Sequence, residues 1–283
     1  MIELAKEDIP ATVPPPDLRI EDEFVVTAYG VAARFRASSW AFRSEFLKHL
    51  DRELPQYECL ADSELPIILD LTWDWSRDGL DRVFGNAELP GDATSRELLL
   101  EQVSARVRLA IAEFADGRVF VHAGVVTLDE KAILIPGSSF SGKTTLVEAL
   151  LSVGARYYSD EYAVINQEGM VEAFTRPLGI RNHSEDRFRS VPHSPETITE
   201  LIGGPPVPIT LIVVTEYVEG AEWKPEMLSP GEGLIEILKH TVPIRRRPAF
   251  TMDVLGRAVE KAGIVRSPRG DASQLVGKLK LFL

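Results

Sequence analysis

The sequence predicts an α/β protein in which a mixed sheet carries a glycine-rich loop, together with a smaller α+β N-terminal domain. The segment 137–144, Gly-Ser-Ser-Phe-Ser-Gly-Lys-Thr, has a glycine, four free positions and then Gly-Lys-Thr. An apolar run of strand length, 132–135, precedes it, and a helical pattern, 145–151, follows it. A separate group of strand and helix patterns lies in residues 21–94.

Composition and charge exclude several classes of protein. The 283 residues are 45% hydrophobic, which allows one large or two modest domains with a real core. The formal net charge of −12 argues against nucleic-acid and anionic-membrane binding. Cys59 is the only cysteine, so internal disulfides and cysteine-rich metal sites are excluded. Residues 1–8 lack the apolar core of a secretory signal, and no apolar run is long enough to span a membrane. We therefore expect a cytoplasmic protein with no nucleic-acid and no membrane partner.

The first part of the chain predicts the smaller domain. Residues 1–20 are rich in proline and are expected to form an extended arm. Hydrophobic periodicity over 21–94 then predicts, in order, strands at 24–28 and 31–35, a helix at 39–54, a strand at 65–75 and a loop at 79–94. This part shows no catalytic constellation, and its aromatic side chains are expected to form a core.

The second domain is placed at 95–283. A helix beginning at the Thr-Ser-Arg-Glu segment 94–97 and ending before Gly117 opens it. The patterns beyond it predict strands at 119–127 and 131–135, the helix at 145–151, strands at 156–158, 163–166 and 209–215, and helices at 229–240 and 250–262, the latter taken as the last. The turn at 128–130 is so short that the strands beside it should form an antiparallel hairpin. This hairpin is unusual, because its second strand leads into the glycine-rich loop 137–144, and the strand before a loop of this kind commonly has parallel neighbours.

The segment 137–144 matches the phosphate loop of nucleotide-binding proteins. Its two glycines allow successive backbone N–H groups to point into one hollow, and the start of the helix adds partial positive charge. Lys143 can reach the outer phosphates of a nucleotide, and the Thr144 hydroxyl can ligate the Mg²⁺ that bridges them. We therefore expect the nucleotide at Gly137, Ser138, Ser139, Phe140, Ser141, Gly142, Lys143, Thr144 and Thr145.

An acidic pair, Asp160-Glu161, follows the loop helix at the end of the next strand pattern. In such a fold this strand end returns to the phosphate side. One carboxylate can then hold Mg²⁺ together with Thr144, while the other accepts the proton of the phosphate acceptor. A solvated acidic turn is the alternative interpretation.

Two further features have both a structural and a functional interpretation. His122 lies inside the apolar run 119–126, where a histidine is by default a core residue with a satisfied nitrogen. Three consecutive arginines, 245–247, form either a solvated basic turn or a clamp that stabilises charge on a phosphoryl group.

Taken together, residues 95–283 resemble the HPr kinase/phosphorylase family and its related kinases, which are similar in fold to phosphoenolpyruvate carboxykinase. The resemblance rests on the order of His122, the loop and Asp160-Glu161, and on the Val-Pro-Ile-Arg-Arg-Arg segment 242–247, which is similar to the family's Ile-Pro-Val-Arg-Pro-Gly-Arg loop. The second acid is Glu161 where HPr kinases have aspartate, and segment 174–179 lacks the family's metal-contacting glutamate. The related-kinase branch, which is not specific for HPr, is therefore the better match.

The resemblance implies an ATP- and Mg²⁺-dependent kinase that phosphorylates a serine-type hydroxyl on a protein, a peptide or a free amino acid. Lys143 would bind phosphate, Asp160 and Glu161 would serve as base and metal ligand, His122 would support them, and Arg245 would act near the transferred phosphate. Family members are often oligomers, so a homo-oligomer is also within what the resemblance implies. Two other functions stay open: a small-molecule kinase of another phosphate-loop family, and a non-catalytic nucleotide sensor.

Overall fold

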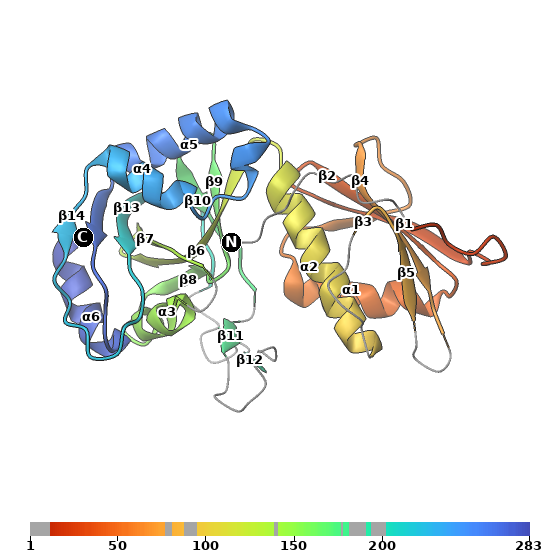
Figure 1. Cartoon of the computed structure of the whole chain (residues 1–283), viewed down its shortest axis with the longest axis horizontal. Coiled ribbons are helices and arrows are strands. Elements are labelled where there is room, and N and C mark those ends of the chain that lie inside the picture. Colours follow the sequence, from red (N-terminus) through yellow and green to blue (C-terminus); the bar gives the residue numbers. More distant parts are fainter. Residues whose placement is uncertain are drawn as a thin grey trace. The chain divides into compact units, whose positions relative to one another are not determined.

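The computed structural model describes residues 12–76, 81–87, 95–138, 141–176, 178–180, 191–193 and 202–283, and the chain forms two compact units (Figure 1). Unit 1 is Met1–Asp116 and unit 2 is Gly117–Leu283. The units divide later than the boundary expected between residues 94 and 95. The reason is that helix α2, Arg96–Phe114, packs against helix α1, Ala41–Glu53, and against the sheet of unit 1.

Unit 1 contains a mixed sheet with the strand order β3-β1-β2-β4-β5. The strands are β1 (Asp22–Ala28), β2 (Val31–Ala37), β3 (Glu58–Leu60), β4 (Ile67–Asp74) and β5 (Arg82–Gly85). The expected strands around Tyr29-Gly30 are confirmed: β1 and β2 pair antiparallel, and both turn residues have positive φ, as a tight hairpin turn requires. The expectation of a loop over 79–94 is wrong at β5, which pairs antiparallel with β4. The described part of the N-terminal arm begins at Thr12, whose N–H donates to the carbonyl of Gly85 at 3.0 Å.

The core of unit 1 is aromatic. Phe35 and Phe46 have ring centroids 4.6 Å apart, and Phe42 stacks on Trp73 at 4.7 Å. All four side chains are buried, as is Phe24 beside them. Rings of this size remove much apolar surface from water, so they stabilise α1 on the sheet and confirm the expectation of a core.

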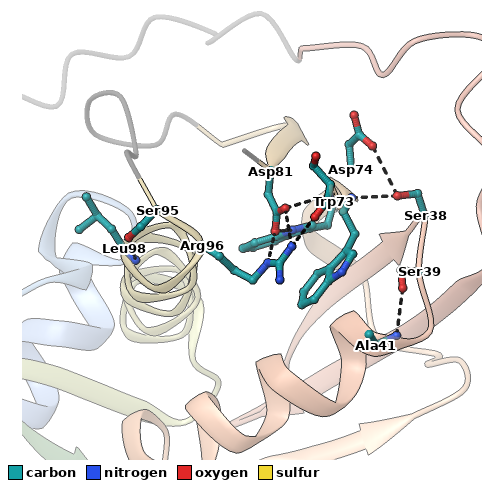
Figure 2. A network of polar contacts seen from close by, with 11 residues as sticks. Ser38, Ser39, Ala41, Trp73, Asp74, Asp81, Ser95, Arg96 and Leu98 are labelled. Carbon is teal, nitrogen blue, oxygen red and sulfur yellow. Dashed lines mark hydrogen bonds and ion pairs between the residues drawn. The ribbon is translucent and has the colours of Figure 1, made fainter. Parts of the chain in front are cut away.

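A polar network connects β4, the chain beyond it and the start of α2 (Figure 2). The buried carboxylate of Asp81 accepts hydrogen bonds from Arg96 Nε at 2.7 Å and from Trp73 Nε1 and the Ser76 N–H at 2.8 and 2.9 Å. Arg96 also stacks on Trp75, with its guanidinium carbon 3.5 Å from the ring centroid. Burial raises the pKa of Asp81, but the hydrogen bonds from Arg96 and Trp73 outweigh it, so the pKa lies below its usual value.

Replacing Asp81 with asparagine is expected to lower the stability of unit 1 by about 2–4 kcal/mol, because Arg96 loses its carboxylate partner. Asp81 has a folded pKa below its unfolded pKa. Its contribution is therefore complete above about pH 3.9 and is lost as the pH falls through the lower folded value. Urea unfolding at several pH values measures both effects. Asp74→Asn is the matched control, since its partner Arg82 is exposed and the change should cost about 1 kcal/mol or less.

Unit 2 is built on a larger mixed sheet with the order β10-β9-β6-β7-β13-β15-β14, and β8 also pairs with β6. Its strands are β6 (Arg118–Leu128), β7 (Lys131–Pro136), β8 (Arg156–Ser159), β9 (Tyr162–Asn166), β10 (Met170–Glu172), β13 (Val207–Val214), β14 (Glu226–Met227) and β15 (Gly263–Arg266). The predicted hairpin is confirmed, because β6 and β7 pair antiparallel. On its other side β7 pairs parallel with β13, which makes the neighbourhood of the loop strand mixed. A short pair, β11 (Leu178–Ile180) with β12 (Val191–His193), lies apart from this sheet.

Helices cover the sheet of unit 2 on two sides (Figure 1). Helices α3 (Lys143–Leu151) and α6 (Ala272–Leu279) share one apolar cluster with the sheet, and α4 (Pro230–Leu238) and α5 (Pro248–Glu260) share another. The expectation that the helix near 250–262 is the last one is wrong, because β15 and α6 follow it. The α/β class with mixed sheets is confirmed. No helix in the described ranges combines the length and apolarity needed to cross a membrane.

Candidate functional site

The glycine loop connects the buried strand β7 to helix α3. Gly142 is the N-cap of α3 and has φ +83°, a conformation that strongly favours glycine. A Cβ atom at Gly142 would also lie 2.5 Å from Arg269 Nη2, so a side chain here would displace the Arg269 guanidinium. Ser139 and Phe140 lie outside the described residues, so the expectation for them stays a prediction.

Lys143 is folded back across the loop that precedes it. Its side chain is buried, and Nζ donates to the carbonyls of Gly137 and Ser138 at 2.8 and 2.7 Å. These bonds hold the ammonium group against the glycine loop. The first N–H groups of α3, which have no partner within the helix, follow directly after the loop. This arrangement concentrates positive charge and donors in one place, which suits an anion such as phosphate.

Strand β6 ties the loop to the acidic pair through its backbone. The carbonyl of His122 accepts from the Gly137 N–H at 3.1 Å, and the next residue, Ala123, donates its N–H to the carbonyl of Glu161, also at 3.1 Å. The first residue of the loop and the second acid of the pair thus contact adjacent residues of one strand. The loop and the acidic pair are separated in sequence, but they come together because β7 and β8 both pair with β6.

Two histidines face this region. Burial lowers the pKa of His122, and the nearby Lys143 ammonium lowers it further, while Glu161 opposes them. Burial and then Lys143 also lower the pKa of His240, whose carbonyl accepts from the His122 N–H at 2.8 Å. Both rings are therefore neutral at pH 7, and they add no positive charge beside Lys143. Sequence reasoning missed His240, because it lies far from the loop in sequence and is joined to it only by pairing with β6.

Asp160 accepts a hydrogen bond from a buried tyrosine. The Tyr157 hydroxyl lies 2.9 Å from Asp160 Oδ1 and 2.9 Å from the carbonyl of Arg176. A phenol has one proton, so it can donate fully to only one of these acceptors at a time. Burial, followed by the charge of Asp160, raises the pKa of Tyr157 well above its usual value, and the phenol stays neutral. Tyr157 thereby positions the Asp160 carboxylate.

Glu161 has a different partner. Its carboxylate forms an ion pair with Arg176, and both side chains are largely buried. The Tyr157 hydroxyl therefore contacts Asp160, and the Arg176 guanidinium contacts Glu161. Which of the two acids serves as base and which as metal ligand stays a prediction.

The predicted metal ligands form an all-oxygen set. Within the ranges that the structure describes, no cluster of three or more His, Cys, Asp or Glu side chains is placed to hold a metal ion. Thr144, Asp160 and Glu161 offer a hydroxyl and two carboxylates instead. Mg²⁺ commonly takes one or two protein carboxylates and completes its octahedron with water and substrate phosphates, so this donor set fits Mg²⁺.

Arg245 lies exposed on a short 3₁₀ turn, η2 (Pro243–Arg245). The preceding segment pairs with β6, since the Val242 N–H donates to the carbonyl of Phe120 at 3.0 Å. Arg247 donates to the carbonyl of Arg118 at 3.1 Å and lies over the Phe250 ring. Arg247 therefore has a structural role, and a role for Arg245 near the transferred phosphate stays a prediction.

Arg269 is the second site residue that sequence reasoning missed. It follows β15, its side chain is buried, and Nη2 donates to the carbonyl of Gly142 at 2.6 Å. This contact ties the end of the loop to the chain between β15 and α6. The only signal in the sequence is a turn pattern around Pro268 and Gly270, which says nothing about contact with the loop.

Comparisons with known proteins give little further information. No family model matches the chain, and no curated protein matches it. Among solved structures, the HPr(Ser) kinase/phosphatase from Coxiella burnetii is similar with a TM-score of 0.33 and 13% sequence identity, covering 57% of this chain and 93% of that chain.

Proposed function

We propose that unit 2 is an ATP- and Mg²⁺-dependent kinase that transfers a phosphoryl group to a serine-type hydroxyl. The observation that carries the proposal is the placement of Lys143 across the glycine loop, with His122 and Ala123 tying that loop to Asp160-Glu161. Phosphoryl transfer needs bound phosphates, charge neutralisation and a group that deprotonates or orients the acceptor. The site offers residues for each of these tasks.

The loop and Lys143 would hold the phosphates of the nucleotide. Backbone N–H groups at the start of α3 would donate to phosphate oxygens, and the ammonium of Lys143 would exchange its carbonyl partners for the outer phosphates. Thr144 and the acidic pair would hold Mg²⁺, which when bound supplies neutralisation of phosphate charge. His122 and His240, whose pKa values are lowered by burial, would be neutral and would not compete with Mg²⁺ for the carboxylates as cations.

Asp160 would accept the proton of the acceptor hydroxyl. The Tyr157 hydroxyl, 2.9 Å from Asp160 Oδ1, would orient one carboxylate oxygen when it donates its proton there, which would reduce reorganisation during transfer. Glu161 would bind Mg²⁺, and its ion pair with Arg176 would break when it does so. The acceptor is a serine-type hydroxyl on a protein, a peptide or a free amino acid, and the protein acts in the cytoplasm, where ATP is available.

A non-catalytic nucleotide sensor is the second candidate. The Arg176–Glu161 ion pair favours it, because this salt bridge occupies one of the two acids and would have to break before Glu161 could hold a metal ion. In a sensor, bound nucleotide would break this pair and change the conformation without transfer. A small-molecule kinase with a purely parallel sheet is less well supported, since β7 has the antiparallel β6 as one neighbour.

The test is transfer from γ-labelled ATP with Mg²⁺ into a panel of free serine, serine-ended peptides, an HPr-type protein and soluble cell proteins. The kinase proposal expects label in one class of acceptor, as an acid-stable phosphoester. ATP that binds without labelling any acceptor would contradict the kinase and support the sensor. Failure to bind ATP would contradict both.

A further inference from the structure

A cavity of about 900 Å³ opens beside the start of helix α3, entirely within unit 2. Gly142 and Thr145 form its end at the loop, and the rest of the wall comes from the chain after β13, the chain after β15 and helix α6. The volume lies within the usual range for small-molecule sites. No residue of the acidic pair and neither histidine of the candidate site lines it.

The cavity and the acidic pair contact different parts of the glycine loop. Gly137 is bonded to His122, next to Ala123, which is bonded to Glu161, whereas Gly142 and the following Thr145 line the cavity. Phosphates held by the loop would then extend between the acids and the cavity. The reacting phosphate would lie beside the acids, so the cavity would receive the group attached to the other end of the phosphate chain.

The wall has the chemistry of a site for a flat aromatic group. Tyr217 is 54% exposed, yet its backbone is fixed to the loop, because its N–H donates to the carbonyl of Ser141 at 3.2 Å. The Arg269 guanidinium lies 5.8 Å from the Tyr217 ring, and Trp223 completes the aromatic part of the wall. Exposed rings held in place are the platforms on which nucleobases stack.

Polar groups in the same wall can form hydrogen bonds with a base or a sugar. Among the described residues, the buried atoms Arg269 Nε and Trp223 Nε1 have no hydrogen-bond partner. Asp271 caps α6 by accepting from the Ser273 N–H at 2.9 Å, and this hydrogen bond lowers the pKa of Asp271, so it is an ionised acceptor at neutral pH. Lys278 adds a cation to the wall.

We propose that this cavity binds the nucleoside part of a nucleoside triphosphate, with the base stacked on Tyr217 and the sugar next to Thr145. The inference rests on the proposed function, because it assumes that the phosphates lie in the loop. It goes further in assigning a place to the nucleoside and in naming residues that recognise the base.

The test compares ATP with inorganic tripolyphosphate, both with Mg²⁺, by isothermal titration calorimetry of the full chain. Wild type should bind ATP more tightly than tripolyphosphate. Tyr217→Ala should weaken ATP binding by about 5- to 100-fold, the usual range for loss of one stacked base, and leave tripolyphosphate binding unchanged. Trp223→Phe keeps a ring but removes the N–H, and it should weaken ATP binding by a smaller factor. Trp40→Ala, an exposed aromatic residue in unit 1, is the matched control and should change neither ligand.

Different outcomes separate this inference from the proposed function. Equal binding of ATP and tripolyphosphate by wild type, or ATP binding unaffected by Tyr217→Ala, would overturn the nucleoside site while leaving phosphate binding by the loop intact. Loss of both ligands in Tyr217→Ala, in a protein with unchanged melting temperature, would also overturn it, because the residue would then act on the phosphates. If wild type binds neither ligand, both the nucleoside site and the proposed function are wrong.

Discussion

Replacing Lys143 with methionine is expected to lower phosphoryl transfer by about 10²–10³-fold and to weaken ATP binding by about 10- to 100-fold. Methionine keeps most of the apolar stem but removes the charge that would contact the outer phosphates. Loss of one such group at a developing charge commonly lowers a rate by about 10²–10³-fold, beyond its effect on binding. Titration calorimetry and transfer from γ-labelled ATP measure the two effects separately.

The control for Lys143→Met must exclude a folding defect, because the buried ammonium also bonds to the Gly137 and Ser138 carbonyls. Circular dichroism and the melting temperature answer this question. Lys261→Met removes an exposed lysine at the end of α5 and should alter neither binding nor transfer. Unchanged ATP affinity in a folded Lys143→Met protein would remove Lys143 from the nucleotide site.

Replacing Asp160 with asparagine is expected to lower transfer by about 10²–10⁴-fold while ATP affinity changes only a few-fold. Asparagine keeps the size and the hydrogen bond from Tyr157, but it cannot accept the proton of a hydroxyl. The loss should therefore appear in kcat. Transfer at saturating ATP and acceptor, measured beside ATP binding, distinguishes this from a binding defect.

Glu168→Gln is the matched control for Asp160→Asn, since Glu168 is an exposed acid in the turn between β9 and β10. It should leave transfer unchanged. If Asp160→Asn transfers at the rate of wild type, Asp160 has no part in the chemistry, and the proton must go elsewhere. If instead ATP binding is lost together with transfer, Asp160 acts on the nucleotide through Mg²⁺ and not as the base.

Features set by local sequence could be predicted. The glycine pattern of the loop, the short turn at 128–130 and the apolar run before the loop each depend on a few neighbouring residues, and the β6–β7 hairpin and α3 follow from them. Strand β5 could not be predicted, because it is a short edge strand of four residues without strong apolar alternation. Helix α6 has an apolar face at Leu275, Val276 and Leu279, but at eight residues its pattern is short enough to be overlooked.

The site was predictable only where its residues lie close to the loop in sequence. Lys143 and the acidic pair follow from motif and spacing. His240 reaches the site because it pairs with β6, and Arg269 reaches it because β15 and α6 pack beside the loop. Such contacts depend on the strand order β6-β7-β13-β15, which no local pattern encodes. The roles of Tyr157 and Arg176 as partners of the two acids required the geometry of the strand end.

Binding of the ATP phosphates by the glycine loop can be measured by backbone hydrogen exchange with and without Mg²⁺ and ATP. Amides in 141–147, at the start of α3, are expected to become protected by saturating ATP, and Lys143→Met should greatly reduce this protection. The Tyr217 amide, which is bonded to Ser141, should be protected with them. Unchanged exchange over 141–147 under saturating ATP, with protection elsewhere in the chain, would show that the glycine loop does not bind the phosphates.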